Sequence, residues 1–424
     1  MPLSSSQEIV ITGTGVVCPI GIGAAAFWQS LVEGRSGIRD LDFYADESLP
    51  PPFGGNVADF DPRKYVRPRK SLKVMSRDIQ LAFAAADLAC GEAGSGPGAC
   101  DPQRLGVVFG AEMIPCDLSE LEMAYRRCMV DGRFDFDRWG TEAIDEMFPL
   151  WMLKYLPNMP ACHIGITRDA RGPNNSITLG EVSGLSAVAE AIRVIQRDHA
   201  EMMIAGGTAD RVAPALWARN QIHENAPRGN DPTRACRPFD AKRTGMVHGE
   251  GAAAFVLEKR SHADARSAPA LARVLGFATT FESVLGGRKP RGDAIRRAIR
   301  GALAQAKLQP NDVGHVNAHG VATRHDDAIE ARAIRDTLGD VPVTAPKSFF
   351  GNLGAGAGAV ELAASVLALH HGQIPPTLNH EHPDPQCPVN VVTGAPRPSE
   401  KPTAMALNHT INGQAVAVLI GTAE

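Results

Sequence analysis

The stretch GPNNSITLGEVSGLSAVAEA, residues 172–191, decides how the rest of the chain is interpreted. It begins with a short run of β-branched and apolar residues that ends at Leu179-Gly180, and it continues with apolar residues at helical spacing. One acidic residue, Glu181, stands between the two patterns. We therefore expect a strand-to-helix turn that presents the Glu181 side chain at a helix N-terminus, where free backbone N–H groups favour an anion.

The composition bounds the class of protein. The chain has 424 residues, of which 44% are apolar and 21% charged, and its formal net charge at pH 7 is −4. These values are typical of a globular protein with one large core or two fused cores. We expect no nucleic-acid partner because there is no basic excess. We expect no membrane partner because no run of about 20 apolar residues is present.

The cysteines and the N-terminus indicate a compartment. The eight cysteines are scattered, without a CxxC pair or a Cys/His ligand spacing, which favours reduced thiols and argues against a zinc site. The first seven residues, MPLSSSQ, lack the basic start and the apolar core of a signal peptide. We therefore expect a cytoplasmic protein without a bound metal.

Two glycine-rich stretches raise a nucleotide-binding alternative. Gly13-Thr-Gly15 follows a buried-strand pattern, but the third glycine and the acidic ribose ligand of a dinucleotide fingerprint are missing. Gly354, Gly356 and Gly358 suggest a phosphate loop, but the Lys-Ser/Thr ending of that loop is absent. Neither stretch predicts a nucleotide site.

Several motifs together resemble the β-ketoacyl-acyl carrier protein synthases, the condensing enzymes of fatty acid and type II polyketide synthesis. The matching stretches are Gly172-Pro-Asn and Ser183-Gly184 of the family's elbow, NAHGVATRHDDAIE (317–330), APKSFFGNLGAGAGAVE (345–361) and the final strand pair at 404–421. The resemblance runs from about residue 8 to 421. It implies an α/β protein with a thiolase-like five-layer αβαβα fold built from two fused similar halves.

We expect the first half to comprise residues 1–265, with the elbow at Glu181 and an insertion at residues 112–160, and the second half to comprise residues 266–424. No repeat is legible in the sequence itself, so the duplication is an implication of the resemblance. Outside the motifs, a basic group either docks an acidic carrier protein or is a solvated charge run. Its members are Arg67, Arg69, Lys70 and Lys73.

The chain departs from the family where the family's chemistry lies. The position of the acyl-accepting cysteine is occupied by Glu181, and that of the second catalytic histidine by Asn352, whereas His319 and Lys347 match. The resemblance thus implies a catalytic set of Glu181, His319, Asn352 and Lys347. It implies substrate contacts from Thr323, Asn412 and Gly413, where Asn412 replaces a phenylalanine that gates the acyl pocket. It implies no cofactor and no metal.

A carboxylate in place of the cysteine excludes ordinary Cys-dependent condensation, which leaves three functions open. The first, which we favour because it explains the loss of cysteine, second histidine and gate together, is a chain-length-factor-like partner of an active ketosynthase. The second is an enzyme of altered chemistry on an acyl thioester (decarboxylation, hydrolysis, cyclisation or proton abstraction) that uses Glu181 and His319. The third is a structural homodimer in which Glu181 caps its helix.

These functions imply different partners and a different state of Glu181. Both of the first two require an acyl carrier protein that bears an acyl or malonyl thioester. The first also implies a heterodimer with a Cys-containing ketosynthase, and a homodimer is the alternative. Burial would raise the pKa of Glu181 and the helix terminus would lower it, so the sequence leaves the protonation state of Glu181 open. Whether the chain is an enzyme is open for the same reason.

Overall fold

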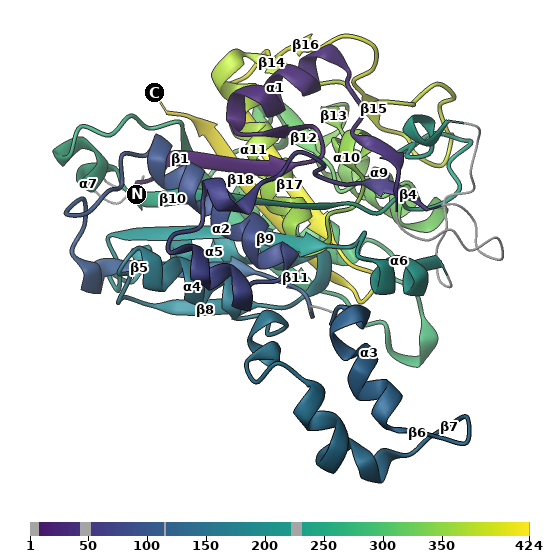
Figure 1. The fold of residues 1–424 in the computed structure, drawn as a ribbon. Coiled ribbons are helices and arrows are strands. Elements are labelled where there is room, and N and C mark those ends of the chain that lie inside the picture. The colour runs from purple at the N-terminus through teal and green to yellow at the C-terminus, as the bar shows by residue number, and fades with distance from the viewer. Residues whose placement is uncertain (1–7, 43–51, 114–115, 222–230, 424) are drawn as a thin grey trace.

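The structure, a computed structural model, describes residues 8–42, 52–113, 116–221 and 231–423. Residues 1–7, on which the signal-peptide argument depends, lie outside the described part. Figure 1 shows strands through the centre of the molecule, helices on both sides of them, and one segment that projects away from the rest.

The strands repeat one arrangement in the two halves. The main strands of the first half are β1 (Ile9–Cys18), β5 (Leu105–Gly110), β8 (Asn174–Ile177), β9 (Met202–Asp210) and β10 (Glu250–Lys259). Those of the second half are β11 (Ala272–Phe281), β12 (His315–Asn317), β13 (Pro342–Thr344), β15 (Asn390–Val391), β17 (Thr403–His409) and β18 (Gln414–Thr422). Within the described residues they follow the order β15-β13-β12-β17-β18-β11-β1-β10-β9-β5-β8.

The direction of pairing shows the duplication. In the first half β1, β10 and β9 pair antiparallel, and β9, β5 and β8 pair parallel. In the second half β11, β18 and β17 pair antiparallel, and β17, β12 and β13 pair parallel. The two sets join where Val10 and Ile11 of β1 pair with Arg273 and Ala272 of β11. The α/β class and the two similar halves that the resemblance implied are confirmed.

Helices form three layers around these strands. Helices α2 (Arg77–Glu92) and α4 (Met159–Thr167) pack on strands of the first half, and α8 (Asp293–Ala306) packs on strands of the second, where it also contacts α9 (Arg324–Leu338). Between the halves lie α5 (Ser183–Gln196) and α11 (Ala357–His371), which contact each other and strands of both. From Ala357 to Leu369, helix α11 is apolar on almost all sides, apart from Glu361 and Ser365, and it is buried.

Glycines let the two halves meet closely behind the elbow. A Cβ atom on Gly184, in the first turn of α5, would lie 2.7 Å from the carbonyl oxygen of Ala355. A Cβ atom on Gly207 of β9 would lie 2.3 Å from the same oxygen. Since neither position has room for a side chain, the elbow of the first half rests on the turn Gly354–Gly356 of the second.

The insertion projects from the body (Figure 1). It also carries apolar side chains that are exposed. It contains α3 (Leu118–Arg127), the short strands β6 (Met129–Val130) and β7 (Arg133–Phe134), and single helical turns such as Trp151–Lys154. Large exposed side chains there include Met123, Phe136, Ile144, Leu150 and Met152. A patch of this kind is typical of a surface that another protein covers.

The remaining elements are short and connect the layers. They are β2 (Gly21–Ile22), α1 (Ala24–Glu33), β3 (Ile38–Asp40), β4 (Phe53–Gly55), α6 (Pro214–Gln221), α7 (Arg260–Ala265), α10 (Lys347–Phe350), β14 (Gln373–Ile374) and β16 (Arg397–Pro398). In the described parts of the chain, none of the helices is both long and apolar enough for a bilayer crossing.

Candidate active site

The strand-to-helix turn expected at Glu181 is present. Strand β8 leads through Leu179 into a 3₁₀ turn, Gly180–Val182, which continues as α5. Gly180 has φ of +60°, a left-handed conformation that glycine adopts without steric cost. The Ser183 hydroxyl closes the turn, because it accepts from the Leu179 N–H at 2.8 Å and donates to the Gly180 carbonyl at 2.6 Å.

Three neighbouring parallel strands bring three charged residues to the elbow. Glu112 follows β5, Glu181 follows β8 and Arg211 follows β9 directly. Arg211 Nη1 donates to Glu181 Oε1 at 2.7 Å, and Arg211 Nε donates to Glu112 Oε2 at 3.0 Å. A further bond joins Arg211 Nη2 to Glu112 Oε1. We call Glu112, Arg211 and Glu181 the elbow ion cluster; their side chains are 14–17% exposed.

The elbow ion cluster decides the charge of Glu181. Burial acts to raise the pKa of Glu181, but the Arg211 guanidinium outweighs burial and lowers that pKa to about 2. The two carboxylates in turn outweigh burial at Arg211 and raise its pKa above the ordinary value. Glu181 is therefore a paired carboxylate at neutral pH. A carboxylate of such low pKa is a weak general base.

Asn352 supports this arrangement. Its Nδ2 lies 3.4 Å from Glu181 Oε1 and 2.8 Å from the Met246 sulfur, and its Oδ1 accepts from the Gly354 N–H at 3.0 Å. The side chain is 1% exposed. The hydrogen bonds of Glu181 to other residues thus go to Arg211 and Asn352, and this engagement argues against the helix cap considered as its third role.

Two donors that face Nδ1 hold His319 in one tautomer. Its Nδ1 lies 3.0 Å from Lys347 Nζ and 3.2 Å from Asn408 Nδ2, and both of these groups are donors. Burial, with the Lys347 charge as a second cause, holds the pKa of His319 well below its usual range. The neutral ring therefore carries its proton on Nε2, where it can donate to an oxygen of a bound molecule.

Lys347 lies behind His319. It is fully buried, donates to the His319 carbonyl at 2.8 Å and pairs with the Glu361 carboxylate. Burial raises the pKa of Glu361 to about 7 against the lowering effect of Lys347. Lys347, implied as a catalytic residue, thus reaches the site through the imidazole that it orients.

The two carboxylates of the histidine motif hold its loop. Glu330 accepts from the His319 and Gly320 N–H groups at 2.7 and 2.9 Å. Asp327 accepts from the Phe239 and Ala322 N–H groups at 2.7 and 3.0 Å. Both carboxylates come from the first turns of α9, so their i, i+3 spacing lets one helix bind the backbone on two sides of the loop.

A second histidine, His409, lies at the end of β17 beside the first. The ring centroids of His319 and His409 are 4.7 Å apart, edge to face. Burial acts to lower the pKa of His409, but Glu330, whose Oε2 lies 3.8 Å from His409 Nε2, outweighs burial and raises that pKa. The two imidazoles therefore differ in charge preference although they are neighbours.

These groups surround one cavity of about 450 Å³. It brings together Glu181, His319 and Asn412 of the predicted site residues. Around them lie both polar and apolar groups. The polar and charged ones that the sequence did not single out are Glu112, Arg211, Arg219, His248, Asp326 and His409, and the apolar ones are Met113, Leu179, Leu216, Met246, Val321 and Ile411. Burial, with Arg211 as a second cause, lowers the pKa of His248 to about 3.

Two predicted substrate contacts lie outside this cavity. Thr323 caps α9, because its hydroxyl accepts from the Asp326 N–H at 3.2 Å, and it lines an adjoining cavity of about 550 Å³. Gly413 has φ of +88° between β17 and β18, and a Cβ atom there would lie 2.1 Å from the Glu282 carbonyl oxygen. The backbone thus requires glycine at residue 413 whatever the ligand.

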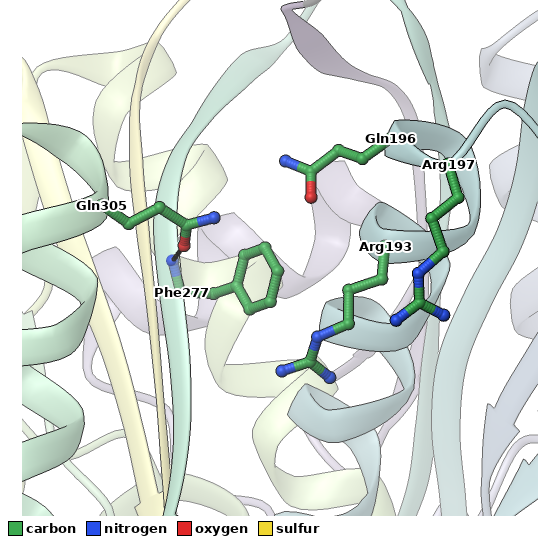
Figure 2. A pocket seen from close by; sticks show the side chains of 5 residues that line it. All are labelled: Arg193, Gln196, Arg197, Phe277 and Gln305. Atoms are coloured by element: carbon green, nitrogen blue, oxygen red, sulfur yellow. Dashed lines mark hydrogen bonds between the residues drawn. The ribbon is translucent and has the colours of Figure 1, made fainter.

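A separate pocket of about 440 Å³ opens at the other end of α5 (Figure 2). The Arg193 guanidinium lies over the Phe277 ring, 4.9 Å from its centroid, and donates to the Thr279 hydroxyl at 3.3 Å. Gln305 Oε1 accepts from the Phe277 N–H at 2.7 Å. Because no paired acid and base is among the residues that line this pocket, the candidate active site remains the cavity at Glu181 and His319.

The arginine and the second acid of the elbow ion cluster were missed from the sequence. A polar residue just after a buried strand is the signal that could have found them, since Glu112 and Arg211 both follow glycine-containing apolar runs. His409 lies in the aligned final strand pair and carries the same signal. Many polar residues follow buried strands, and the order of the strands in the sheet decides which of these residues come into contact.

Comparison with known proteins agrees with this geometry. The family profile "Beta-ketoacyl synthase, N-terminal domain" matches residues 6–263, and "Beta-ketoacyl synthase, C-terminal domain" matches residues 271–381. The chain belongs to the beta-ketoacyl synthase family.

Relatives of the chain in this family include polyketide enzymes. The tetracenomycin polyketide synthase ketoacyl synthase alpha subunit of Streptomyces glaucescens is 35% identical over 99% of this chain and 98% of its own length. Among solved structures, the ishigamide ketosynthase/chain length factor has a TM-score of 0.86 at 27% identity, covering 98% of this chain and 99% of the other. The ketosynthase complex AntDE:AntF, titled a type II polyketide synthase acyl-carrier protein with its ketosynthase, has a TM-score of 0.82 at 26% identity over 98% and 99%. A ketosynthase-like function in polyketide biosynthesis is thus supported.

Proposed function

We propose that this chain is a non-condensing, chain-length-factor-like subunit that pairs with a Cys-containing ketosynthase and works on carrier-bound polyketide intermediates. The elbow ion cluster carries the proposal. Acyl transfer needs a nucleophile at the elbow that attacks a thioester and leaves again. Here the elbow side chain is a carboxylate bonded to Arg211 at 2.7 Å, and releasing it would leave buried charges unpaired, which is costly.

The lining of the cavity supports the same conclusion. Acidic, basic and imidazole side chains line the space next to Glu181, beside apolar side chains such as Met113, Leu216 and Val321. Desolvating these groups with an apolar acyl chain would cost free energy, because their hydrogen bonds to water would be lost without replacement. A subunit that leaves chain attachment to a partner avoids this cost.

Exposed apolar surface near the elbow supports a dimer with a homologous chain. Leu179, Phe281 and Ile411 are 44%, 58% and 61% exposed, and the insertion adds further large apolar side chains. Strand β8 is the last strand of its half, so its outer edge is open to pairing. The ishigamide neighbour is titled a ketosynthase/chain length factor, which fits a heterodimer better than a homodimer.

Basic groups support an acidic carrier protein as a further partner. The cavity that adjoins the active-site cavity, with Asp326 and Ile411 in common, is lined by Arg288, Lys289, Arg324 and His325. The basic group at Arg67, Arg69, Lys70 and Lys73 is exposed. Complementary charge would speed association with a carrier. We place this work in the cytoplasm, where carrier-bound synthesis takes place.

The experiment is co-expression with Cys-containing type II ketosynthases, followed by affinity purification and native mass spectrometry. A 1:1 heterodimer that extends a carrier-bound chain is expected, with product lost when this chain is omitted. Phe281→Glu should weaken the heterodimer, whereas the control Ala25→Glu, exposed on α1, should not. A chain that stays monomeric or homodimeric with every ketosynthase, and that changes no product, contradicts the proposal.

A second function is favoured by one observation: His319 keeps its full set of partners and its Nε2 proton beside an open cavity. Such a donor can stabilise the enolate oxygen that forms when a malonyl thioester loses carbon dioxide. Incubation of the chain alone with malonyl-carrier protein, followed by intact mass, tests it. Decarboxylation that His319→Ala abolishes and Arg193→Ala retains would establish this function; an unchanged malonyl mass would exclude it.

A further inference from the structure

A half-buried cluster of cysteine, histidine and glutamate lies far from the candidate active site. One ligand atom of each of Cys100, Glu201 and His262 lies within 4.8 Å of the other two. Cys100 precedes β5, Glu201 precedes β9, and His262 belongs to α7. Figure 1 shows α7 at one end of the molecule and α6, which follows Arg211, at the other. Since β9 separates Glu201 from Arg211, the two sites are roughly 30 Å apart at about 3.3 Å per strand residue.

The histidine of this cluster is oriented by a buried carboxylate. His262 Nδ1 lies 2.6 Å from Glu258 Oε2, and Glu258 is fully buried in β10. Arg266 Nε donates to the same oxygen at 2.9 Å, and Thr12 and Arg266 bond to the other oxygen. This bond engages Nδ1 and leaves Nε2 for the cysteine, with which the imidazole also interacts. Because Cys100 and Glu258 raise the pKa of His262 to about 9, a metal ion bound there would have to displace a proton from Nε2. Metal-binding histidines commonly show this carboxylate-oriented arrangement.

We propose that Cys100, Glu201 and His262 bind one zinc ion, with the fourth coordination position open to water. Thiolate, imidazole and carboxylate are the ligands that zinc takes in proteins, and bond lengths near 2.0–2.3 Å place ligand atoms about 3.5 Å apart around one tetrahedral ion. The three ligand atoms lie within 4.8 Å of one another. Side-chain rotations that shift these atoms by about an ångström would bring them to the spacing of a zinc site. The ion would tie the segment before β5, the start of β9 and helix α7 together.

The charges around the cluster permit a cation. Arg104 Nη2 lies 3.9 Å from Glu201 Oε1 but only 2.8 Å from Asp198 Oδ1. Lys259 also pairs with Asp198, at 2.6 Å. Both cations therefore have a nearer carboxylate, and Glu201 remains available to a metal. Zinc binding would release the thiol proton of Cys100 and the Nε2 proton of His262 to solvent, and no electron is exchanged.

The proposal revises the expectation of no metal, which rested on the absence of a local ligand spacing. The three ligands are separated by long stretches of sequence, so the usual CxxC signal cannot appear. They converge because β5 and β9 are neighbouring strands and α7 follows β10, the next strand along.

The test is titration of the EDTA-treated, full-length chain with zinc against a chromophoric chelator, with cobalt(II) as a spectroscopic substitute. We expect one zinc per chain, at least tenfold weaker binding in Cys100→Ser and His262→Gln, and unchanged binding in the control Cys162→Ser, a half-buried cysteine outside the cluster. Cobalt should give sulfur-to-metal charge-transfer absorption that Cys100→Ser abolishes. Circular dichroism of each variant checks that it is folded.

Two results would overturn the proposal. One is a zinc affinity and stoichiometry that are the same in the wild type and both cluster variants, because the metal would then bind elsewhere or not at all. The other is a Cys100 thiol whose alkylation rate depends on His262 but does not change with zinc, which would make the cluster a thiol–imidazole pair without a metal.

Discussion

The two halves of the molecule have the same arrangement of strands, but they place different kinds of side chain at one cavity. In the first half, the ends of β5, β8 and β9 supply the elbow ion cluster of Glu112, Glu181 and Arg211. In the second half, the ends of β12, β13 and β17 lead to His319, Lys347 and His409. Duplication thus preserved where functional residues are placed, while the residues themselves diverged.

The difference between the halves teaches which part of the family's reaction this chain retains. The second half keeps an imidazole that is oriented through Nδ1 and can donate from Nε2. The first half holds a carboxylate that Arg211 keeps ionised and bonded. The chain therefore retains a group that stabilises an oxyanion and lacks one that attacks a thioester. The predictions below test each half in turn.

Lys347→Met should have the largest effect, because it leaves the fully buried Glu361 carboxylate without its cation. Breaking a buried ion pair by removing one partner costs about 3–5 kcal/mol. Urea denaturation at about pH 9, above the pKa of Glu361 of about 7, should show this loss in the free energy of unfolding, with Lys289→Met, at an exposed lysine, as the control. Equal loss in both variants would show that the second half does not depend on the network.

Arg211→Met breaks the corresponding cluster in the first half. Glu181 and Glu112 then face each other without a cation, so we expect a loss of about 3 kcal/mol and a pKa of Glu181 above its ordinary value. Denaturation and carboxyl NMR titration measure the two effects. Replacing both carboxylates as well (Arg211→Met, Glu112→Gln, Glu181→Gln) should recover much of the stability; a triple variant as unstable as Arg211→Met would contradict the pairing.

The pH dependence of the free energy of unfolding should reveal how much the ionised Glu181 side chain contributes to stability. The folded-state pKa of about 2 lies below the ordinary value of 4.5, so the stabilisation is complete above about pH 5 and is lost as the pH falls from 4.5 toward 2. A depression of this size corresponds to about 3 kcal/mol at most. The difference in unfolding free energy between the wild type and Glu181→Gln should shrink over that range.

The smallest effect is expected from restoring sulfur at the elbow. Glu181→Cys should give no condensation product from acyl- and malonyl-carrier protein, because Asn352 still stands where a second histidine is needed and Arg211 remains paired with Glu112. Intact mass and product analysis measure this, and alkylation of the introduced thiol shows that it is accessible. Product formation by the single variant would contradict this prediction, because it would show that neither Asn352 nor the pair of Arg211 and Glu112 prevents condensation.

Local patterns were sufficient for much of this architecture. The elbow at Glu181 and the loop at His319 could be predicted because each is defined by residues close together in the chain. Lys347 could be placed in the site by resemblance, but not behind the imidazole, since that depends on how α10 packs. The roles of Thr323 as a helix cap and of Gly413 as a turn residue depend on neighbours that the motif does not contain.

By itself the sequence determined the fold class, the family and the replacement of a thiol by a carboxyl group, because short motifs and hydrophobic periodicity are local properties. Only the tertiary structure decided what that carboxyl group does. Glu112, Glu181 and Arg211 meet because β8, β5 and β9 lie side by side, and Cys100, Glu201 and His262 meet at the opposite ends of such strands. Contacts between residues far apart in the chain are set by the order of strands in the sheet, and the free energy of pairing buried charges exists only once that order has formed.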